Sequence, residues 1–107
     1  MAGTGLMRGR VYAAKLPHVG DEKFYVVVSN DRRNQQLPQV LAARLTTSPK
    51  SPRSSVVELD DREMFAGRVV CDDIETIWPD EVIRDLGPLT REAMARVSDG
   101  LRAALDL

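Results

Sequence analysis

Two short polar stretches carry the side chains that could do chemistry in this sequence of 107 residues. The first is Glu22-Lys23, which stands before an apolar run, and the second is Thr46-Thr47-Ser48, which follows another apolar run. A cation that faces hydroxyl groups can bind phosphate, and a carboxylate nearby can take part in proton transfer. If the two apolar runs form neighbouring strands, both stretches open into one cleft. The sequence then predicts a phosphate-handling site in that cleft.

Basic side chains are expected at the rim of the cleft. They are Arg32, Arg33, Lys50 and Arg53. Residues 1–55 hold nine basic and three acidic side chains, a charge of +6, whereas residues 56–107 hold six and thirteen, a charge of −7. This asymmetry indicates an anion-binding face built from the first half. The alternative is that both sets of charges, Lys23 included, are simply solvated, and that the threonines end a strand by bonding their own backbone.

The composition excludes several kinds of site. His18 is the only histidine and Cys71 the only cysteine, so the usual metal-ligand spacings are missing, as is a glycine-rich phosphate loop. We therefore expect an enzyme that needs no metal ion or other cofactor. A single cysteine fits a reducing compartment, and no apolar run reaches 18 residues. With no signal-peptide pattern at the N-terminus, the sequence predicts a cytoplasmic protein without a membrane span. We expect His18 at the surface and Cys71 in the core.

The length and pattern predict one domain over residues 1–107, α+β and mostly β. Expected strands are Arg8–Leu16, Phe24–Ser29, Gln39–Thr46, Val56–Leu59 and Gly67–Ile77, the last with a bulge or a second short strand at Asp72-Asp73. The unbroken apolar run in Phe24–Ser29 indicates burial on both faces, as in a barrel or sandwich. The polar segments Asn30–Pro38 and Thr47–Ser55 are expected to be loops, the second of them mobile.

The last thirty residues change to a helical period. Pro79 suits the first position of a short helix through Leu86, which Gly87-Pro88 would end. Thr90 suits the N-cap of a second helix. The apolar residues that recur at helical spacing are Leu89, Met94, Val97, Leu101 and Leu105. We therefore expect a curved sheet with a C-terminal amphipathic helix packed on it.

Five stretches, taken together, resemble the MazF/PemK family of bacterial toxins. They are RGRVYAAKLP (Arg8–Pro17), GDEK followed by VVVSND (Gly20–Asp31), ARLTTSPK (Ala43–Lys50), AGRVVCDDIETI (Ala66–Ile77) and LTREAMARVSDGLRAALDL (Leu89–Leu107). They look like the opening strand, the Gly-x-Glu loop with the second strand, the threonine-bearing strand with its basic loop, the fifth strand and the closing helix. No single stretch is specific, but their order and spacing match over nearly the whole chain.

The resemblance implies a small SH3-like barrel, a fold shared with the CcdB gyrase poisons, with a C-terminal amphipathic helix. It implies a homodimer that acts as a metal-independent, sequence-selective endoribonuclease on single-stranded RNA (mRNA, tRNA or rRNA). It also implies a cognate antitoxin protein that inhibits the enzyme. In the family, the ribose 2′-hydroxyl attacks the neighbouring phosphate and leaves a cyclic phosphate and a 5′-hydroxyl.

Three catalytic positions carry over from the family. The family threonine falls on Thr46, with Thr47 as the alternative, the glutamate falls on Glu22, and an arginine falls on Lys23. This chain departs from the commoner pattern, in which a spacer and Arg-Pro follow the glutamate. Lysine is a point charge and cannot make a bidentate fork. If Lys23 points to solvent, another basic residue could supply the cation: Arg8, Arg10 or Arg44.

The side chains expected to contact RNA are Arg8, Arg32, Arg33, Thr47, Ser48, Lys50 and Arg53. We expect the aromatic residues Tyr12, Phe24 and Tyr25 in the core, so base discrimination would rest on polar groups of the loops, namely Asn30, Asn34, Gln35, Gln36 and Ser48. Two other functions stay open. One is a non-catalytic poison that binds a protein target such as DNA gyrase, and the other is a member that binds RNA or antitoxin without cleaving.

Overall fold

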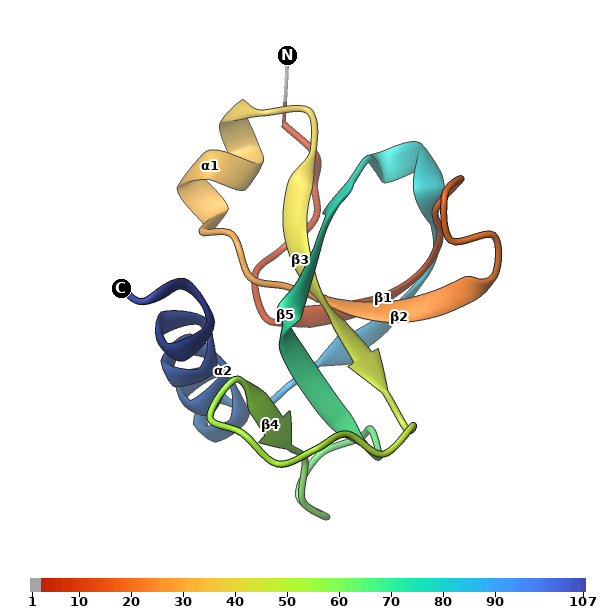
Figure 1. The fold of residues 1–107 in the computed structure, drawn as a ribbon. Helices are drawn as coiled ribbons and strands as arrows, with labels where there is room; N and C mark the ends of the chain where they lie inside the picture. Colours follow the sequence, from red (N-terminus) through yellow and green to blue (C-terminus); the bar gives the residue numbers. More distant parts are fainter. Residues whose placement is uncertain (1–2) are drawn as a thin grey trace.

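The structure, a computed structural model, describes residues 3–107. Six strands, two α-helices and one 3-10 turn make up this part of the chain (Figure 1). In chain order the elements are β1 (Arg10–Lys15), β2 (Glu22–Val27), α1 (Asp31–Gln36), β3 (Val40–Thr46), β4 (Val56–Glu58), β5 (Arg68–Ile77), the 3-10 turn η1 (Pro79–Glu81), β6 (Val82–Pro88) and α2 (Arg91–Leu105).

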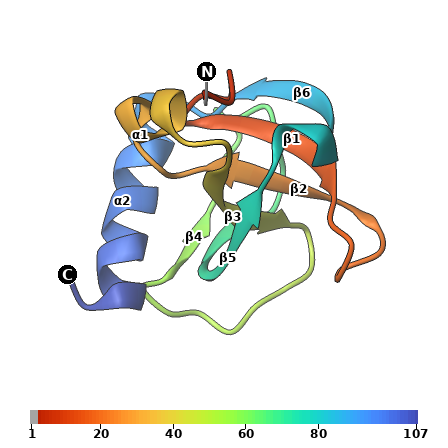
Figure 2. The same cartoon turned by 90° about the horizontal axis from the view of Figure 1, so that it is seen from above.

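All six strands belong to one antiparallel sheet with the order β4-β5-β3-β2-β1-β6. The sheet curls strongly, and α2 lies against β4 and β5 on one face (Figures 1 and 2). Within residues 3–107 the curl does not close, since β4 and β6 remain its edges. The expected mostly-β, barrel-like fold with a C-terminal helix is confirmed, in the form of an open curved sheet.

Apolar residues are buried on both faces of the sheet. The cluster between the sheet and α2 contains Val11, Val26, Ala43, Leu45, Val57, Val69, Cys71, Leu89, Ala93, Met94 and Val97. The cluster inside the curl contains Tyr12, Ala14, Leu16, Tyr25, Val27, Val40, Ala42 and Ile77. Successive residues of β2 alternate between the two clusters, which is why its sequence is apolar without interruption. The predicted burial of this strand on both faces is confirmed.

The C-terminal helix begins as predicted. The Thr90 hydroxyl accepts a hydrogen bond from the Ala93 amide at 3.1 Å, and it donates one to the Glu63 carboxylate at 2.6 Å. Met94 and Val97 are buried on the sheet, but Leu105, which the helical spacing assigns to the same face, is half exposed beyond the edge of the sheet. No helix within residues 3–107 is long and apolar enough to cross a membrane.

The prediction that Asn30–Pro38 is a loop is wrong, because this segment contains α1. The Asn30 side chain caps this helix by accepting a hydrogen bond from the Arg33 amide at 2.9 Å. Asn34 is its one buried residue, and it exchanges hydrogen bonds with Ser29, at 2.6 Å to the hydroxyl and 2.9 Å to the carbonyl. Polar caps and side-chain bonds hold this helix, so it has no apolar period that could have revealed it.

The expected helix Pro79–Leu86 is also wrong. Pro79 does start a helical turn, but η1 ends at Glu81 and the chain continues as β6. β6 pairs with the edge of β1, with Ala13 opposite Arg84. Pairing with an open strand edge outweighs the local helix pattern. The predicted bulge in β5 is confirmed, because residues 71–73 stay outside its ladder with β3.

We expect the Cys71 thiol to be unreactive in the native protein. Burial raises the pKa of Cys71 to about 11. At pH 8 the native protein should therefore react with a thiol reagent only as fast as local unfolding exposes the thiol. Gly100→Ala should speed this reaction about tenfold or more, because a Cβ at Gly100 would lie 2.7 Å from the Cys71 sulfur and strain the core. Rapid labelling of the folded wild-type protein would contradict the expectation.

Candidate active site

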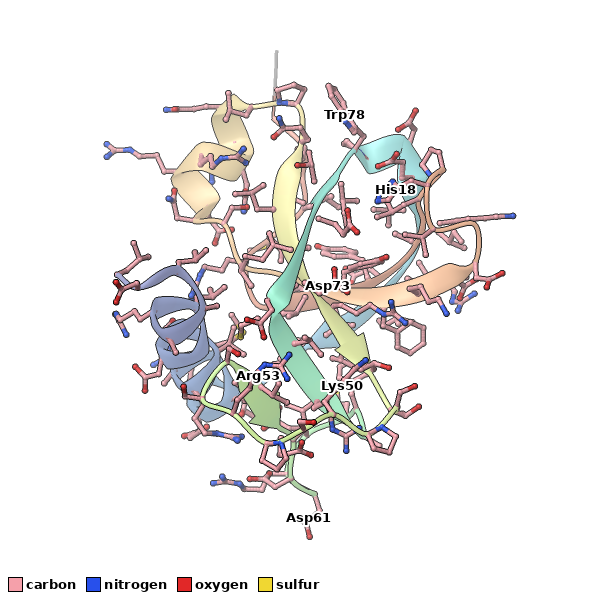
Figure 3. The ribbon with its side chains drawn as sticks, viewed as in Figure 1. His18, Lys50, Arg53, Asp61, Asp73 and Trp78 are labelled. Carbon is pink, nitrogen blue, oxygen red and sulfur yellow. The ribbon has the colours of Figure 1, made fainter. Side chains whose placement is uncertain are left out.

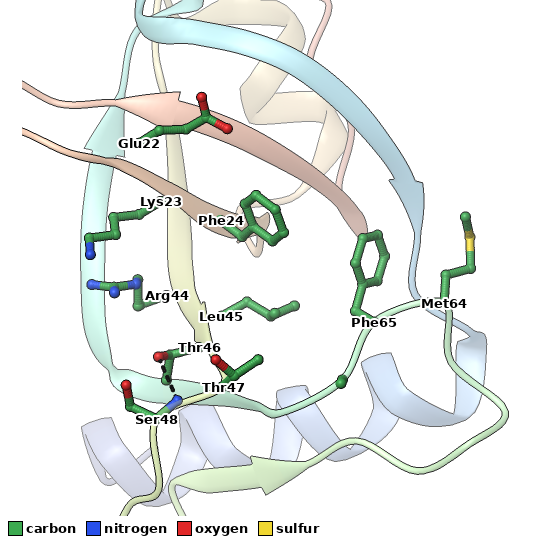
Figure 4. Close-up of a pocket in the computed structure, with 11 residues that line it drawn as sticks. Glu22, Lys23, Phe24, Arg44, Leu45, Thr46, Thr47, Ser48, Met64 and Phe65 are labelled. Carbon is green, nitrogen blue, oxygen red and sulfur yellow. Dashed lines mark hydrogen bonds between the residues drawn. The ribbon is translucent and has the colours of Figure 1, made fainter.

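A cleft of about 440 Å³ opens where β2 begins and β3 ends (Figure 4). Its lining residues are Glu22, Lys23, Phe24, Arg44, Leu45, Thr46, Thr47, Ser48, Met64, Phe65 and Ala66. They come from the start of β2, the end of β3 with the turn after it, and the segment before β5. The prediction that the Glu22-Lys23 and Thr46–Ser48 stretches open into one cleft is confirmed.

The strand register explains this convergence. β2 pairs antiparallel with β3, with Phe24 opposite Leu45 and Tyr25 opposite Arg44. One step further along this register, Lys23 stands across from Thr46. Because side chains alternate between faces, Lys23, Arg44 and Thr46 belong to the face that carries Tyr25. Burial raises the pKa of Tyr25, and the positive charge of Arg44 on the same face partly offsets this rise.

The cleft has a cationic wall and an apolar wall. Lys23 and Arg44 extend to one side in Figure 4, whereas Phe24, Leu45 and Phe65 lie on the other. Phe24 and Phe65 are half-buried, so part of each ring faces the cleft. The sequence assigns Phe24 to the core and gives no reason to select Phe65, which lies in an irregular segment. Sequence reasoning missed these two rings, together with the lining residues Leu45, Met64 and Ala66.

Hydrogen bonds hold the turn after β3 in place. The Thr46 hydroxyl accepts a hydrogen bond from the Ser48 amide at 3.1 Å (Figure 4). Arg68 donates from Nη1 to the carbonyls of Thr47 and Ser48, at 2.9 and 2.8 Å, and its Nε is paired with Glu58. Thr46 therefore uses one lone pair on its own backbone, as the plainer interpretation of the sequence requires, while its O–H proton remains free to donate into the cleft.

Glu22 lies at the mouth of the cleft and is held by β6. Its carboxylate accepts a hydrogen bond from Arg84 Nη2 at 2.6 Å, across the intervening strand β1. Both side chains are at least a third exposed, so this ion pair adds little to the stability of the fold. Its main effect is to hold the Glu22 carboxylate in place.

Two of the predicted basic residues lie on the loop that follows Thr46. Figure 3 shows Lys50 near the end of β3, whereas Arg53 lies at the far end of the loop, close to β4. Lys50 is exposed, whereas Arg53 pairs with Asp72 at 3.0 Å. Hydrogen bonds from Ser55 and from Arg53 hold the pKa of Asp72 below its usual range. These bonds tie the far end of the loop to β5.

None of the five predicted basic residues is among the residues that line the cleft, and Arg8, Arg32 and Arg33 lie elsewhere on the fold. Arg32 and Arg33 lie on α1, which joins the end of β2 to the start of β3 and so lies at the opposite end of both strands (Figure 1). Arg33 bonds Gln39 through both terminal nitrogens. Arg8 bonds the Val28 carbonyl and the Ser98 hydroxyl of α2, at 3.1 and 2.9 Å. Of the polar loop residues expected to read bases, Ser48 alone lines the cleft within the described chain.

Acidic and sulfur ligands do not gather around the cleft. In residues 3–107 no three His, Cys, Asp or Glu side chains converge in an arrangement that could hold a metal ion. His18 is exposed and lies 2.9 Å from Glu75 at another part of the surface. The site therefore consists of cations, hydroxyl groups, one carboxylate and two aromatic rings.

The model of one protein family matches residues 7–105, and its description is PemK-like, MazF-like toxin of type II toxin-antitoxin systems. The chain belongs to this family. Among the relatives of this MazF/PemK member, the endoribonucleases MazF4 of Mycobacterium tuberculosis and MazF1 of Mycobacterium bovis are each 34% identical over 101 residues. Each alignment covers 94% of this chain and 93% of the relative. The resemblance inferred from five stretches of sequence is confirmed.

Solved structures agree with this assignment. An endoribonuclease in complex with its cognate antitoxin, from a mycobacterial species, has a TM-score of 0.87 at 34% identity, over 94% of this MazF/PemK chain and 95% of the other. MazF from Deinococcus radiodurans has a TM-score of 0.79 at 18% identity, over 94% and 96%. At that lower identity the second likeness concerns the fold alone.

We expect Gly67→Ala to damage both the stability and the site of this MazF/PemK member. Gly67 has a φ of +101°, and a Cβ there would overlap the carbonyl oxygen of Thr46. Left-handed strain and the overlap together should lower the free energy of unfolding by roughly 2–5 kcal/mol. Urea denaturation measures this change.

Gly20→Ala is the matched control. Gly20 has a φ of +89° with open space around the position of a Cβ, so this variant should show only the strain of about 1–2 kcal/mol. Equal losses for the two glycines would contradict the role given to the contact between Gly67 and Thr46.

Proposed function

We propose that this chain is the endoribonuclease toxin of a type II toxin–antitoxin system and cleaves single-stranded RNA in the cleft between β2 and β3. The observation that carries the proposal is the convergence of Lys23 and Thr46 at one end of the sheet, beside exposed parts of two aromatic rings. The relatives at 34% identity bear the name endoribonuclease, which supports the same activity for this chain.

The proposed reaction needs no co-reactant from outside the RNA. The ribose 2′-oxygen attacks the adjacent phosphorus, a 2′-O–P bond forms, and the P–O5′ bond breaks. The products are a 2′,3′-cyclic phosphate and a 5′-hydroxyl. One proton leaves the 2′-hydroxyl and one proton reaches the 5′-oxygen, so the reaction is balanced without water or metal ion.

The side chains of the cleft match these needs. Glu22 carries the carboxylate among the described lining residues and is paired with Arg84, and we assign to it the role of taking the 2′-hydroxyl proton. The Lys23 ammonium can give a proton to the 5′-oxygen and neutralise charge on the phosphorane. The Thr46 hydroxyl, on a turn braced by Arg68, can donate to a non-bridging oxygen. Neutralisation by cationic side chains supports a reaction that is independent of metal ions.

Single-stranded RNA fits the two walls of the cleft. Bases that are splayed from a single strand can stack on Phe24 and Phe65, while the phosphates follow the cationic wall and Lys50. Thr47 and Ser48 offer hydroxyl groups and backbone atoms at the cleft for reading base edges. This arrangement supports selectivity for short sequences and favours single strands over a paired duplex, whose bases are not free to stack on the rings.

Three properties implied by the family complete the proposal. The protein acts as a homodimer in the cytoplasm, and its cognate antitoxin inhibits it by placing an acidic segment over the cleft. Such a segment would compete with RNA phosphate for the same cations, Lys23, Lys50 and Arg53.

The first test is cleavage of a long single-stranded transcript in EDTA. We expect discrete fragments with cyclic phosphate and 5′-hydroxyl ends. Thr46→Val and Lys23→Met should each lower the cleavage rate by about 100-fold or more, since each removes a group that stabilises or protonates the transition state. Thr76→Val, an exposed change on β5, is the matched control and should cleave like wild type.

Two outcomes would overturn the proposal. One is intact RNA with the wild-type protein, and the other is full activity of both site variants. If RNA stays intact while expression of the protein raises DNA damage, a poison of DNA gyrase becomes the better explanation.

The second test separates the two groups of basic residues by salt dependence. Lys50→Ala should lower the magnitude of the slope of log affinity against log salt by about 0.7 for a short oligonucleotide, because one phosphate contact is lost. Arg32→Ala, on α1 at the other end of β3, should leave the slope unchanged. Equal effects would show that the RNA also contacts α1.

A further inference from the structure

Arg44 is a charged residue on a central strand of the sheet. Arg44 lies on β3 between the buried residues Ala43 and Leu45. Strand β3 is paired with a neighbouring strand on each side. Its side chain is half-buried, and its guanidinium lines the cleft on the same side as the Lys23 ammonium (Figure 4). A core strand thus places a permanent positive charge at the proposed site.

The Nε atom of Arg44 is fully buried and has no hydrogen-bond partner in residues 3–107. A buried N–H group without a partner costs free energy, and more so when it belongs to a charged group. The neighbouring Lys23 adds a like charge. Neither residue takes part in any ion pair formed within the described chain. Two adjacent, uncompensated cations define a site for an anion.

Other arginines of the described chain are paired, bonded to backbone or exposed; Arg96 also has a buried Nη2 without a hydrogen bond, but this atom lies 3.9 Å from the Asp60 carboxylate. Those paired with a carboxylate are Arg10, Arg53, Arg62, Arg68, Arg84, Arg96 and Arg102. Arg8 and Arg33 donate to backbone carbonyls, and Arg32 and Arg91 are exposed to solvent. Arg44 is the half-buried guanidinium that keeps its donors for something outside the described residues.

We propose that Arg44 is a catalytic residue whose guanidinium fork binds the two non-bridging oxygens of the scissile phosphate. This inference rests on the proposed function. The inference assigns different roles to the two cations. Arg44 holds the phosphate and neutralises the phosphorane, while Lys23 gives its proton to the departing 5′-oxygen. Arg44 itself neither gains nor loses a proton. Glu22 takes the proton of the 2′-hydroxyl, so the reaction stays balanced.

The physical properties of the two side chains favour this division. A guanidinium is planar, always charged and able to bind two phosphate oxygens at once, whereas an ammonium gives up a proton far more readily. Arg44 is also anchored on a strand that is packed on both sides, so its fork is positioned before the substrate arrives. A lysine can therefore stand at the start of β2, because Arg44 supplies the guanidinium from β3.

The test uses an oligonucleotide that spans a cut mapped on the long transcript, under single-turnover conditions. Arg44→Lys keeps the charge but removes the fork, and Arg44→Met removes both. We expect each variant to cleave about 100-fold more slowly than wild type or slower still. Binding of the same oligonucleotide with a 2′-deoxy residue at the cut should weaken less than tenfold. Arg102→Lys, on the exposed face of α2, is the matched control and should cleave at the wild-type rate.

A second readout separates contact with phosphate from a structural role. Sulfur is placed at each non-bridging position of the cut linkage in turn. The wild-type enzyme should cleave the two diastereomers at different rates, and Arg44→Lys should reduce this ratio to nearly one. Thermal unfolding of each variant is measured alongside. If Arg44→Met does not fold, Arg44→Lys alone provides the test.

The outcomes distinguish the two proposals. A wild-type protein that leaves all RNA intact overturns the proposed function. A wild-type protein that cleaves, with folded Arg44 variants within threefold of its rate or with an unchanged ratio between diastereomers, overturns the role of Arg44 alone. Slow cleavage together with loss of the ratio supports that role.

Discussion

The antiparallel pairing of β2 with β3 is the constraint on which the rest of the structure depends. It sets Phe24 opposite Leu45 and Tyr25 opposite Arg44, so the start of one strand lies beside the end of the other. A slip of one residue would turn every side chain of a strand to the other face and separate Lys23 from its neighbours in the cleft. Buried residues on both faces prevent such a slip. The geometry of the site is therefore fixed by the packing of the core.

Much of the fold could be predicted from the sequence, because apolar patterning records burial. The strands that carry the site and the cap at Thr90 were evident in this way. The helix α1 was not, because Asn30 and Asn34 hold it through polar contacts that leave no apolar period. Strand β6 was not, because its state depends on a free edge of β1, which only the folded sheet reveals. The ring of Phe65 was not, because an irregular segment gives no indication of where its side chains point.

Folding also changes the meaning of the charge distribution. The basic first half and acidic second half of the sequence are joined by ion pairs across the fold, such as Arg10 with Asp85 and Arg53 with Asp72. These two arginines are the members of the nine basic side chains in residues 1–55 that pair with a carboxylate within the described chain. The other seven have no such pair in the described chain, and two of them, Lys23 and Arg44, stand next to each other in the cleft. Counting charges in the sequence indicates the sign of a ligand, whereas the folded structure shows which cations lie together without a carboxylate partner.

The apolar clusters are made by strand interiors and α2, whereas much of the cleft wall comes from the turn over residues 46–48 and the segment over residues 64–66. Thr47, Ser48, Met64 and Ala66 are all exposed. Replacements at these positions alter what the cleft recognises without repacking either cluster. Under the proposed function, one scaffold of this kind could diverge toward different RNA targets while its stability and its proposed reacting groups stay constant.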